Sequence, residues 1–166
     1  MLVLGIDPGV STTGYGLIEA RGSHLLFRGA GVLRSSASLA LPRRLDLLCA
    51  QLEELLDGCD PPQVAMESIF QGRNVRSALT MAHVRGAYLL SLARRGLEVR
   101  EYAPTEVKKA VTGHGRAAKE QVREMVQRLL KPTRLPPSLD ASDALAVAIC
   151  HAQVSRFESN VRICSA

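Results

Sequence analysis

The apolar run Leu2-Val3-Leu4-Gly5-Ile6 stops abruptly at Asp7-Pro8-Gly9. A short apolar run bounded by turn residues predicts a strand buried on both faces, with Asp7 at its carboxyl end. Residues 12–18 return too soon for parallel pairing, so the two strands are predicted to form a hairpin. An ionised carboxylate at the rim of a sheet core needs hydrogen bonds, a cation or a metal. Asp7 is therefore either a turn residue that accepts amide protons or part of a site with further acids.

The remaining pattern predicts one α/β domain over residues 1–157 and a frayed tail over 158–166. Further strands are expected over 24–34, 63–67 and 97–102. Helices are expected over 41–58, 72–95 and 139–157. Two more helices are expected, one that begins at Pro104 and one that runs from Ala117 to just before Pro132. In the helix over 72–95, one stripe is formed by apolar and small residues: Val75, Leu79, Ala82, Gly86, Leu89 and Ala93. Ala82 and Gly86 would let another element approach closely, either within the chain or across a dimer.

Length, cysteines and charge limit the class of protein. The 166 residues fit one ordinary domain that can bury its own core. The four cysteines are scattered without Cys-x-x-Cys spacing, so neither a zinc site nor a disulfide framework is expected. Because the chain contains no run of about 18 apolar residues and no basic-then-apolar leader, we expect a cytoplasmic protein with no membrane association. The formal net charge of +5 favours polyanionic partners.

A second apolar strand, Gln63-Val64-Ala65-Met66-Glu67, also ends in a carboxylate. A strand, a crossover helix and another strand favour parallel pairing with a right-handed connection. In open sheets the functional crevice lies at the carboxyl ends of such strands. If this strand neighbours the first, Glu67 lies beside Asp7.

Two more acids, Asp140 and Asp143, stand at the start of the last predicted helix. Their spacing puts both side chains on one face of that helix. They could simply cap the helix, because acids at a helix amino terminus resemble a capping box and gain from the helix dipole. However, the helix is nearly free of charge through Ile149, which predicts a buried face and places the acids at the rim of the core.

These four carboxylates would repel one another unless cations lay between them. Oxygen ligands suit Mg²⁺ or Mn²⁺, and two ions about 4 Å apart can activate water and stabilise a leaving oxygen in phosphodiester cleavage. Two lysines, Lys108 and Lys109, follow the Pro104 turn, and Lys119 follows the glycine-containing loop. Each could contact a phosphate or could belong to a solvated helix face. Arg116, in the glycine-containing loop over 112–116, is a further candidate DNA contact.

Phe70 follows the Glu67 strand end, where an aromatic ring could stack on an unpaired base or could cover the core. Arg73, Asn74 and Arg76 would then line nucleic acid. His114 and His151 receive no role from the sequence.

Over nearly its whole length the chain resembles the RuvC family of bacterial Holliday-junction resolvases, within the ribonuclease H-like superfamily. Each matching motif is weak alone, but their order and spacing are specific. The motifs are Gly5-Ile6-Asp7-Pro8-Gly9 with Gly14-Tyr15-Gly16, Met66-Glu67-Ser68-Ile69-Phe70, Ala103-Pro104-Thr105-Glu106-Val107-Lys108, residues 113–119, and Asp140-Ala141-Ser142-Asp143-Ala144-Leu145-Ala146.

The resemblance implies an α/β, ribonuclease H-like fold: a five-stranded mixed sheet flanked by helices on both faces. It implies a homodimer that places two active sites on a four-way DNA junction and makes paired nicks, leaving 5′-phosphate and 3′-hydroxyl ends. Asp7, Glu67, Asp140 and Asp143 match the metal-binding catalytic carboxylates, Lys108 and Lys119 match the catalytic lysines, and Phe70 matches the stacking aromatic. Some relatives carry a histidine where Asp140 stands. Mg²⁺, for which Mn²⁺ can substitute, and the branch-migration proteins RuvA and RuvB are the implied cofactor and partners.

Two other classes of protein share parts of this pattern. Actin-like and sugar-kinase ATPases also pair an Asp with glycines in their first hairpin, but they need two such domains, for which 166 residues are too few. A module that binds branched DNA without cutting it would gain nothing from carboxylates that face phosphates. A metal-dependent junction nuclease is therefore the expected function.

Overall fold

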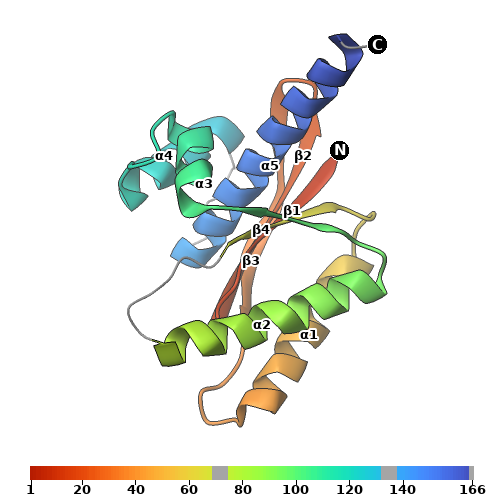
Figure 1. Ribbon diagram of the computed structural model, residues 1–166, viewed down its shortest axis with the longest axis vertical. Coiled ribbons are helices and arrows are strands. Elements are labelled where there is room, and N and C mark those ends of the chain that lie inside the picture. Colours follow the sequence, from red (N-terminus) through yellow and green to blue (C-terminus); the bar gives the residue numbers. More distant parts are fainter. Residues whose placement is uncertain (69–74, 132–137, 165–166) are drawn as a thin grey trace.

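The computed structural model describes residues 1–68, 75–131 and 138–164 of the chain. Phe70, Arg73 and Asn74, for which DNA contacts are predicted, lie outside these residues. In chain order the elements are β1 (Leu2–Asp7), β2 (Thr12–Arg21), β3 (His24–Arg34), α1 (Leu41–Asp57), β4 (Gln63–Glu67), α2 (Val75–Arg94), β5 (Val99–Tyr102), α3 (Pro104–Thr112), α4 (Lys119–Leu130) and α5 (Leu139–Cys164) (Figure 1).

The strands form one mixed sheet in the order β3-β2-β1-β4-β5. The β1–β2 and β2–β3 pairs are antiparallel, as predicted for a hairpin followed by a third strand. The β1–β4 and β4–β5 pairs are parallel, and Ile6 is opposite Met66 in the first of them. Asp7 and Glu67 are the next residues along these two strands, so both lie at the same edge of the sheet.

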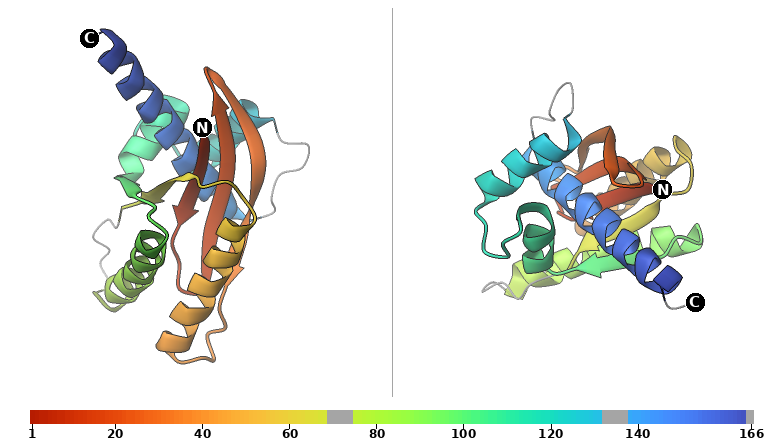
Figure 2. Two further views of the ribbon diagram at one scale, coloured as in Figure 1. Left: turned by 90° about the vertical axis from the view of Figure 1, so that its right-hand side faces the viewer. Right: turned by 90° about the horizontal axis from the view of Figure 1, so that it is seen from above.

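Helices cover both faces of the sheet, as expected. Alternate side chains of β1 point to opposite faces, so Val3 joins the core beneath α3, α4 and α5, while Leu4 and Ile6 join the core beneath α1 and α2. Figures 1 and 2 show α5 crossing the sheet with α3 and α4 beside it, and its carboxyl end leaning away from the strands. None of the helices over the described ranges is long and apolar enough to cross a membrane.

Three strand glycines let α5 lie directly on the central strands. A Cβ atom at Gly5 would overlap the backbone oxygen of Ala144, and one at Gly14 would overlap that of Asp140. A Cβ atom at Gly16 would stand 2.7 Å from the backbone nitrogen of Leu145. Because Gly14 is also opposite Asp7 in the β1–β2 pair, this contact brings the amino end of α5 to the edge where Asp7 lies.

The stripe predicted on α2 lies on the exposed side of this helix rather than on its inner side. The stripe that begins with Val75 and Leu79 is exposed, with 71% and 57% of the respective residues accessible to solvent. The buried residues are instead Val84, Arg85, Tyr88, Ser91 and Leu92. Both faces of this helix carry apolar residues at helical spacing, so periodicity alone could not identify the inner one.

The last helix also differs from its expected length, because α5 continues beyond Phe157 to Cys164. No glycine or proline interrupts residues 139–164, and each added residue of an existing helix gains one backbone hydrogen bond. Glu158, expected in a frayed tail, pairs with Arg100 of the neighbouring strand at 3.6 Å. Other boundaries move slightly as well: β2 continues to Arg21, β5 begins at Val99 and α4 begins at Lys119.

Candidate active site

Asp7 and Glu67 end adjacent parallel strands at the functional edge of the sheet. The turn after Asp7 is held by another residue, since the Gly9 amide donates to Thr13 Oγ1 at 3.1 Å and the Thr13 hydroxyl donates to the Gly9 carbonyl at 2.8 Å. The Gly9 amide of the Asp-Pro-Gly turn is therefore satisfied by the Thr13 hydroxyl rather than by the Asp7 carboxylate. This observation favours a site role for Asp7 over a turn role.

Asp140 and Asp143 come from the first turns of α5, which the strand glycines hold against β1 and β2. Asp140 accepts a long hydrogen bond of 3.4 Å from the Ser138 hydroxyl. Asp143 pairs with Lys119 at 3.4 Å. Asp140 also stands where the helix dipole favours a negative charge, so its position suits both a helix-stabilising role and a site role.

The carboxylates share one electrostatic environment. Burial is the largest cause that raises the pKa of Asp7 from 3.8 to about 7, followed by the charges of Glu67, Asp143 and Asp140, while Lys119 opposes the shift. Burial and then the charge of Asp143 also raise the pKa of Glu67. Acids from β1, β4 and α5 therefore interact across the sheet edge.

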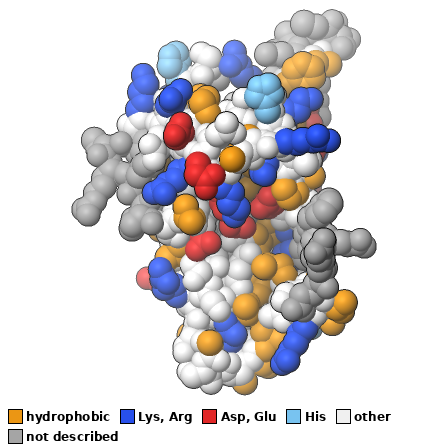
Figure 3. Space-filling view, turned by 90° about the vertical axis from the view of Figure 1, so that its left-hand side faces the viewer, with side chains coloured by type: hydrophobic (Ala, Val, Ile, Leu, Met, Phe, Trp, Pro, Cys, Tyr) orange, Lys and Arg blue, Asp and Glu red, His pale blue; other side chains and the backbone are white. Residues whose placement is uncertain are grey.

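Two lysines border this group. A recess of about 200 Å³ is lined by Glu67, Pro104, Val107, Lys108, Lys119, Val122, Asp143 and Ala146. Lys119 begins α4, and its side chain is 73% exposed although it pairs with Asp143. The charge of Asp143 is the largest cause that raises the pKa of Lys119. Figure 3 views the side of the molecule that carries α3 and α4 and shows acidic side chains with Lys and Arg side chains around them.

The other predicted DNA contacts within the described residues do not line this recess. Lys109, Arg116 and Arg76 are exposed and are absent from the recess lining. Lys109 follows Lys108 in α3, Arg116 precedes α4, and Arg76 lies in the first turn of α2. All three can therefore reach an extended ligand only outside the recess.

The donor set suits a divalent cation. Among the described residues, no three Asp, Glu, His or Cys side chains are grouped closely enough to surround one ion in this arrangement. Asp and Glu side chains can rotate about their own bonds, so these acids could draw closer around a bound ion. Because the raised pKa of Asp7 reflects a partly buried site rich in negative charge, Asp7, Glu67, Asp140 and Asp143 fit a hard cation that prefers oxygen ligands.

The sequence did not reveal two residues of α2 that support the site. The Arg85 guanidinium donates to the Glu67 carbonyl oxygen, and the Tyr88 hydroxyl donates to Thr13 Oγ1 at 2.9 Å. The only local signal would have been an arginine and a tyrosine one turn apart, which is weak in a helix that also carries Arg76, His83 and Arg94. By contrast, His151 lies at the other end of β4, where its Nε2 is 2.8 Å from Gln63 Oε1.

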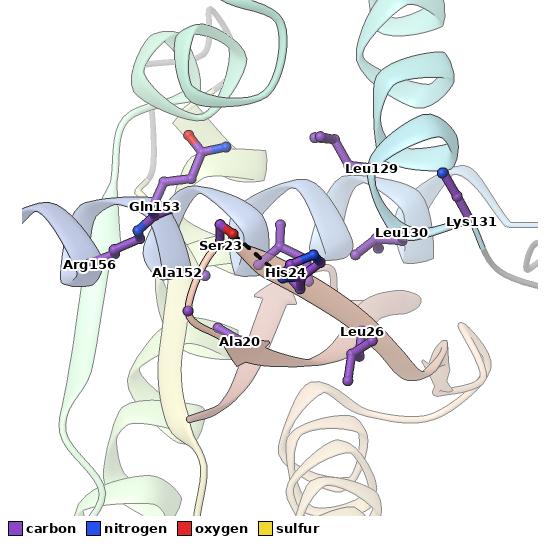
Figure 4. A pocket seen from close by; sticks show the side chains of 12 residues that line it. Ala20, Ser23, His24, Leu26, Leu129, Leu130, Lys131, Ala152, Gln153 and Arg156 are labelled. Atoms are coloured by element: carbon purple, nitrogen blue, oxygen red, sulfur yellow. Dashed lines mark hydrogen bonds between the residues drawn. The ribbon is translucent and has the colours of Figure 1, made fainter.

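A larger cavity lies away from the acids. It measures about 610 Å³ and is lined by residues of the β2–β3 hairpin, the end of α4 and the middle of α5: Ala20, Gly22, Ser23, His24, Leu25, Leu26, Leu129, Leu130, Lys131, Ala152, Gln153 and Arg156 (Figure 4). Glu19, next to Ala20 in β2, is opposite Leu2 at the start of β1, whereas Asp7 ends that strand. This cavity is therefore not part of the carboxylate site.

Comparisons with known proteins agree with this geometry. The family model for crossover junction endodeoxyribonuclease RuvC matches residues 3–151. Proteins of that name from Chlorobaculum parvum and Rubrobacter xylanophilus are 50% and 46% identical, covering 90% and 95% of this chain and 80% and 88% of their own lengths. The structure of Thermus thermophilus RuvC in complex with Holliday junction substrate matches with a TM-score of 0.89 and 33% identity over 95% of this chain and 96% of that one.

The structural match confirms the predicted ribonuclease H-like fold with its five-stranded mixed sheet. The sequence matches extend over the segments that carry Asp7, Glu67, Asp140 and Asp143. On both grounds, this chain belongs to the crossover junction endodeoxyribonuclease RuvC family.

Proposed function

We propose that this protein hydrolyses phosphodiester bonds of four-way DNA junctions with Asp7, Glu67, Asp140 and Asp143 holding divalent cations. The observation that carries the proposal is the meeting of acids from three distant segments at one sheet edge, where burial and then the charges of the neighbouring acids raise the pKa of Asp7 to about 7. Carboxylates that face a polyanion would weaken its binding unless they held cations. Family membership supplies the substrate class.

The side chains have separate roles in this proposal. Bound Mg²⁺, for which Mn²⁺ can substitute, would supply an activated water and neutralise charge on the leaving oxygen. Asp7 and Glu67 hold the central position because rigid neighbouring strands fix their backbones. Lys119, largely exposed beside Asp143, is placed to leave that ion pair and contact a phosphate, and Lys108 lines the same recess. The products carry 5′-phosphate and 3′-hydroxyl ends.

DNA contacts extend beyond the recess. Lys109, Arg116 and Arg76 are exposed cations from three separate segments of the chain, and exposed cations suit backbone phosphates. Phe70, Arg73 and Asn74 follow the Glu67 strand end in the chain, and we propose that Phe70 stacks in the junction centre while Arg73 and Asn74 line the nucleic acid.

We also propose that two copies pair through the exposed face of α2. Val75, Leu79, Leu89 and Leu90 leave an unusual amount of apolar surface in water on one helix. Gly86 on the same face has open space where a Cβ would stand, which allows close helix approach. A self-complementary contact of this kind generates twofold symmetry, which matches paired nicks on a two-fold junction. In sedimentation experiments, Leu79→Asp should yield monomers that still bind junctions weakly.

The proposed cellular setting follows from the substrate. Recombining DNA lies in the bacterial cytoplasm, so we place the protein there, acting after the branch-migration proteins RuvA and RuvB. A pull-down of RuvB and RuvA with the wild-type protein on junction DNA tests this assignment, with linear duplex as the control.

The central experiment compares three substrates of the same sequence. Purified protein with Mg²⁺ should cut a four-way junction symmetrically and leave linear duplex and an RNA–DNA hybrid nearly intact. Equal cutting of all three substrates would reject junction selectivity. Junction binding without any cleavage would identify a binding module, and ATP hydrolysis without DNA would identify an ATPase.

A further inference from the structure

The peptide group that follows Glu67 is held from both sides. Its carbonyl oxygen accepts a hydrogen bond from the Arg85 guanidinium. Its amide, which belongs to Ser68, donates to the Tyr102 carbonyl at 2.8 Å. Because a peptide group is planar, fixing both its oxygen and its nitrogen fixes its orientation and therefore holds in place the Glu67 Cα, from which the side chain leaves the strand.

Arg85 is itself rigidly placed. The residue is only 6% exposed, on the inner face of α2. Its second guanidinium nitrogen pairs with Glu101 Oε1 at 2.6 Å, and Glu101 is opposite Met66 in the β4–β5 pair. A buried guanidinium without partners is costly, so its position is set by these two acceptors. One side chain of α2 thus fastens the ends of β4 and β5.

We propose that Arg85 is a positioning residue that orients Glu67 for cation binding and thereby links the α2 helix to the cleavage site. The guanidinium touches the Glu67 backbone and leaves the carboxylate free for a ligand. The inference rests on the proposed nuclease function.

Variants at Arg85 separate positioning from folding. Arg85→Lys keeps the charge but cannot reach two acceptors in the same fork geometry, and Arg85→Met removes both interactions. The matched control is Arg95→Met just beyond α2, which removes an ion pair with Asp57 of 2.7 Å at a distance from the site. Glu101→Gln removes the charge partner of Arg85 while leaving its contact with Glu67.

Two measurements test the proposal. Calorimetric titration of Mn²⁺ into the protein without DNA should show about tenfold weaker binding for Arg85→Lys and Arg85→Met, the usual size of effect for a residue that orients a metal ligand. Single-turnover junction cleavage should require about tenfold more Mg²⁺ for half its maximal rate, and high Mg²⁺ should restore most of that rate. Junction binding in EDTA and the Arg95→Met control should match wild type, and Glu101→Gln should show a smaller shift than Arg85→Met.

Failure of the proposed nuclease function and failure of the positioning role of Arg85 give different results. Wild-type protein that fails to cut junctions would reject the proposed function. Wild-type protein that cuts, together with folded Arg85→Lys that has unchanged Mn²⁺ affinity and Mg²⁺ dependence, would overturn the positioning role alone. If Arg85→Met does not fold, Arg85→Lys decides the question, because it retains the buried charge. A Glu101→Gln shift equal to that of Arg85→Met would also overturn the role of the Glu67 contact.

Discussion

The two ends of strand β4 differ in the partners that their polar side chains have. At its start, Gln63 contacts His151, whose other ring nitrogen is 2.8 Å from the Tyr102 hydroxyl, so the histidine has a partner on both sides. At its end, Glu67 faces Asp7 and Asp143, whose charges have the same sign as its own. One end is a satisfied hydrogen-bond chain that stabilises the fold. The other end holds unfavourable electrostatic energy that a bound cation can remove.

Asp7→Asn should produce the largest effect. The variant should lower the junction cleavage rate by at least about 1000-fold, because it removes a central metal ligand worth several kcal/mol in the transition state. Junction binding should stay the same or improve, since one negative charge no longer faces the DNA backbone. A gel-based cleavage and binding assay measures both. Asp46→Asn, in an exposed pair with Arg43, is the control and should behave as wild type.

The pH dependence of the unfolding free energy should reveal the ionisation of Asp7. In EDTA, the folded state holds a proton on Asp7 up to about pH 7, whereas the unfolded chain loses it near 3.8. The unfolding free energy should therefore fall as pH rises from about 4 to about 7, by at most about 4 kcal/mol from this group. Urea unfolding at pH 5 and pH 8 measures the change. A fall just as steep in Asp7→Asn would contradict the assignment.

Lys119 should affect cleavage far more than stability. Its side chain is 73% exposed, so its pair with Asp143 contributes little to folding, about 0–1 kcal/mol. Lys119→Met should slow single-turnover cleavage by about 10- to 100-fold if the ammonium offsets charge in the transition state. Lys131→Met, near the far cavity, is the matched control. Equal rates for both variants would remove Lys119 from the mechanism.

His151 should affect stability far more than cleavage, and its effect on cleavage should be the smallest of all. His151→Leu should lower the unfolding free energy by about 1–3 kcal/mol, because it leaves the buried Tyr102 hydroxyl without a partner. Cleavage per folded molecule should stay within about twofold of wild type, since the residue lies at the opposite end of β4. Chemical unfolding and cleavage under matched conditions test this contrast. A large loss of cleavage with unchanged stability would reverse it.

His151 also predicts a pH effect of opposite sign to that of Asp7. Burial is the largest cause that lowers the pKa of this imidazole below 6.5. The unfolded chain therefore binds a proton that the folded state resists, and stability from this group is lost as pH falls through 6.5. In His151→Leu this loss of stability at low pH should disappear, and thermal melts between pH 5 and pH 7 would measure it.

Much of the site could be predicted because its acids occupy positions that local patterns mark. Asp7 and Glu67 each end a short apolar strand, and a strand-helix-strand order favours parallel neighbours, as observed. Asp140 and Asp143 stand three residues apart before a nearly uncharged helix. Hydrophobic periodicity and chain order are encoded in neighbouring residues, so the sequence by itself determined the strand ends and the helix start that carry the acids, and it favoured a common sheet edge for Asp7 and Glu67.

Tertiary structure alone decided which surfaces touch. The glycines at positions 5, 14 and 16 matter because α5 lies on them, and nothing local shows that contact. α2 carries apolar residues on both faces, and only packing against α1 and the sheet buries the face with Arg85 and Tyr88. The support that Arg85 gives to Glu67 depends on residues 18 positions apart. Such contacts are long-range, and the free energy that selects them comes from the whole packed core rather than from any one segment.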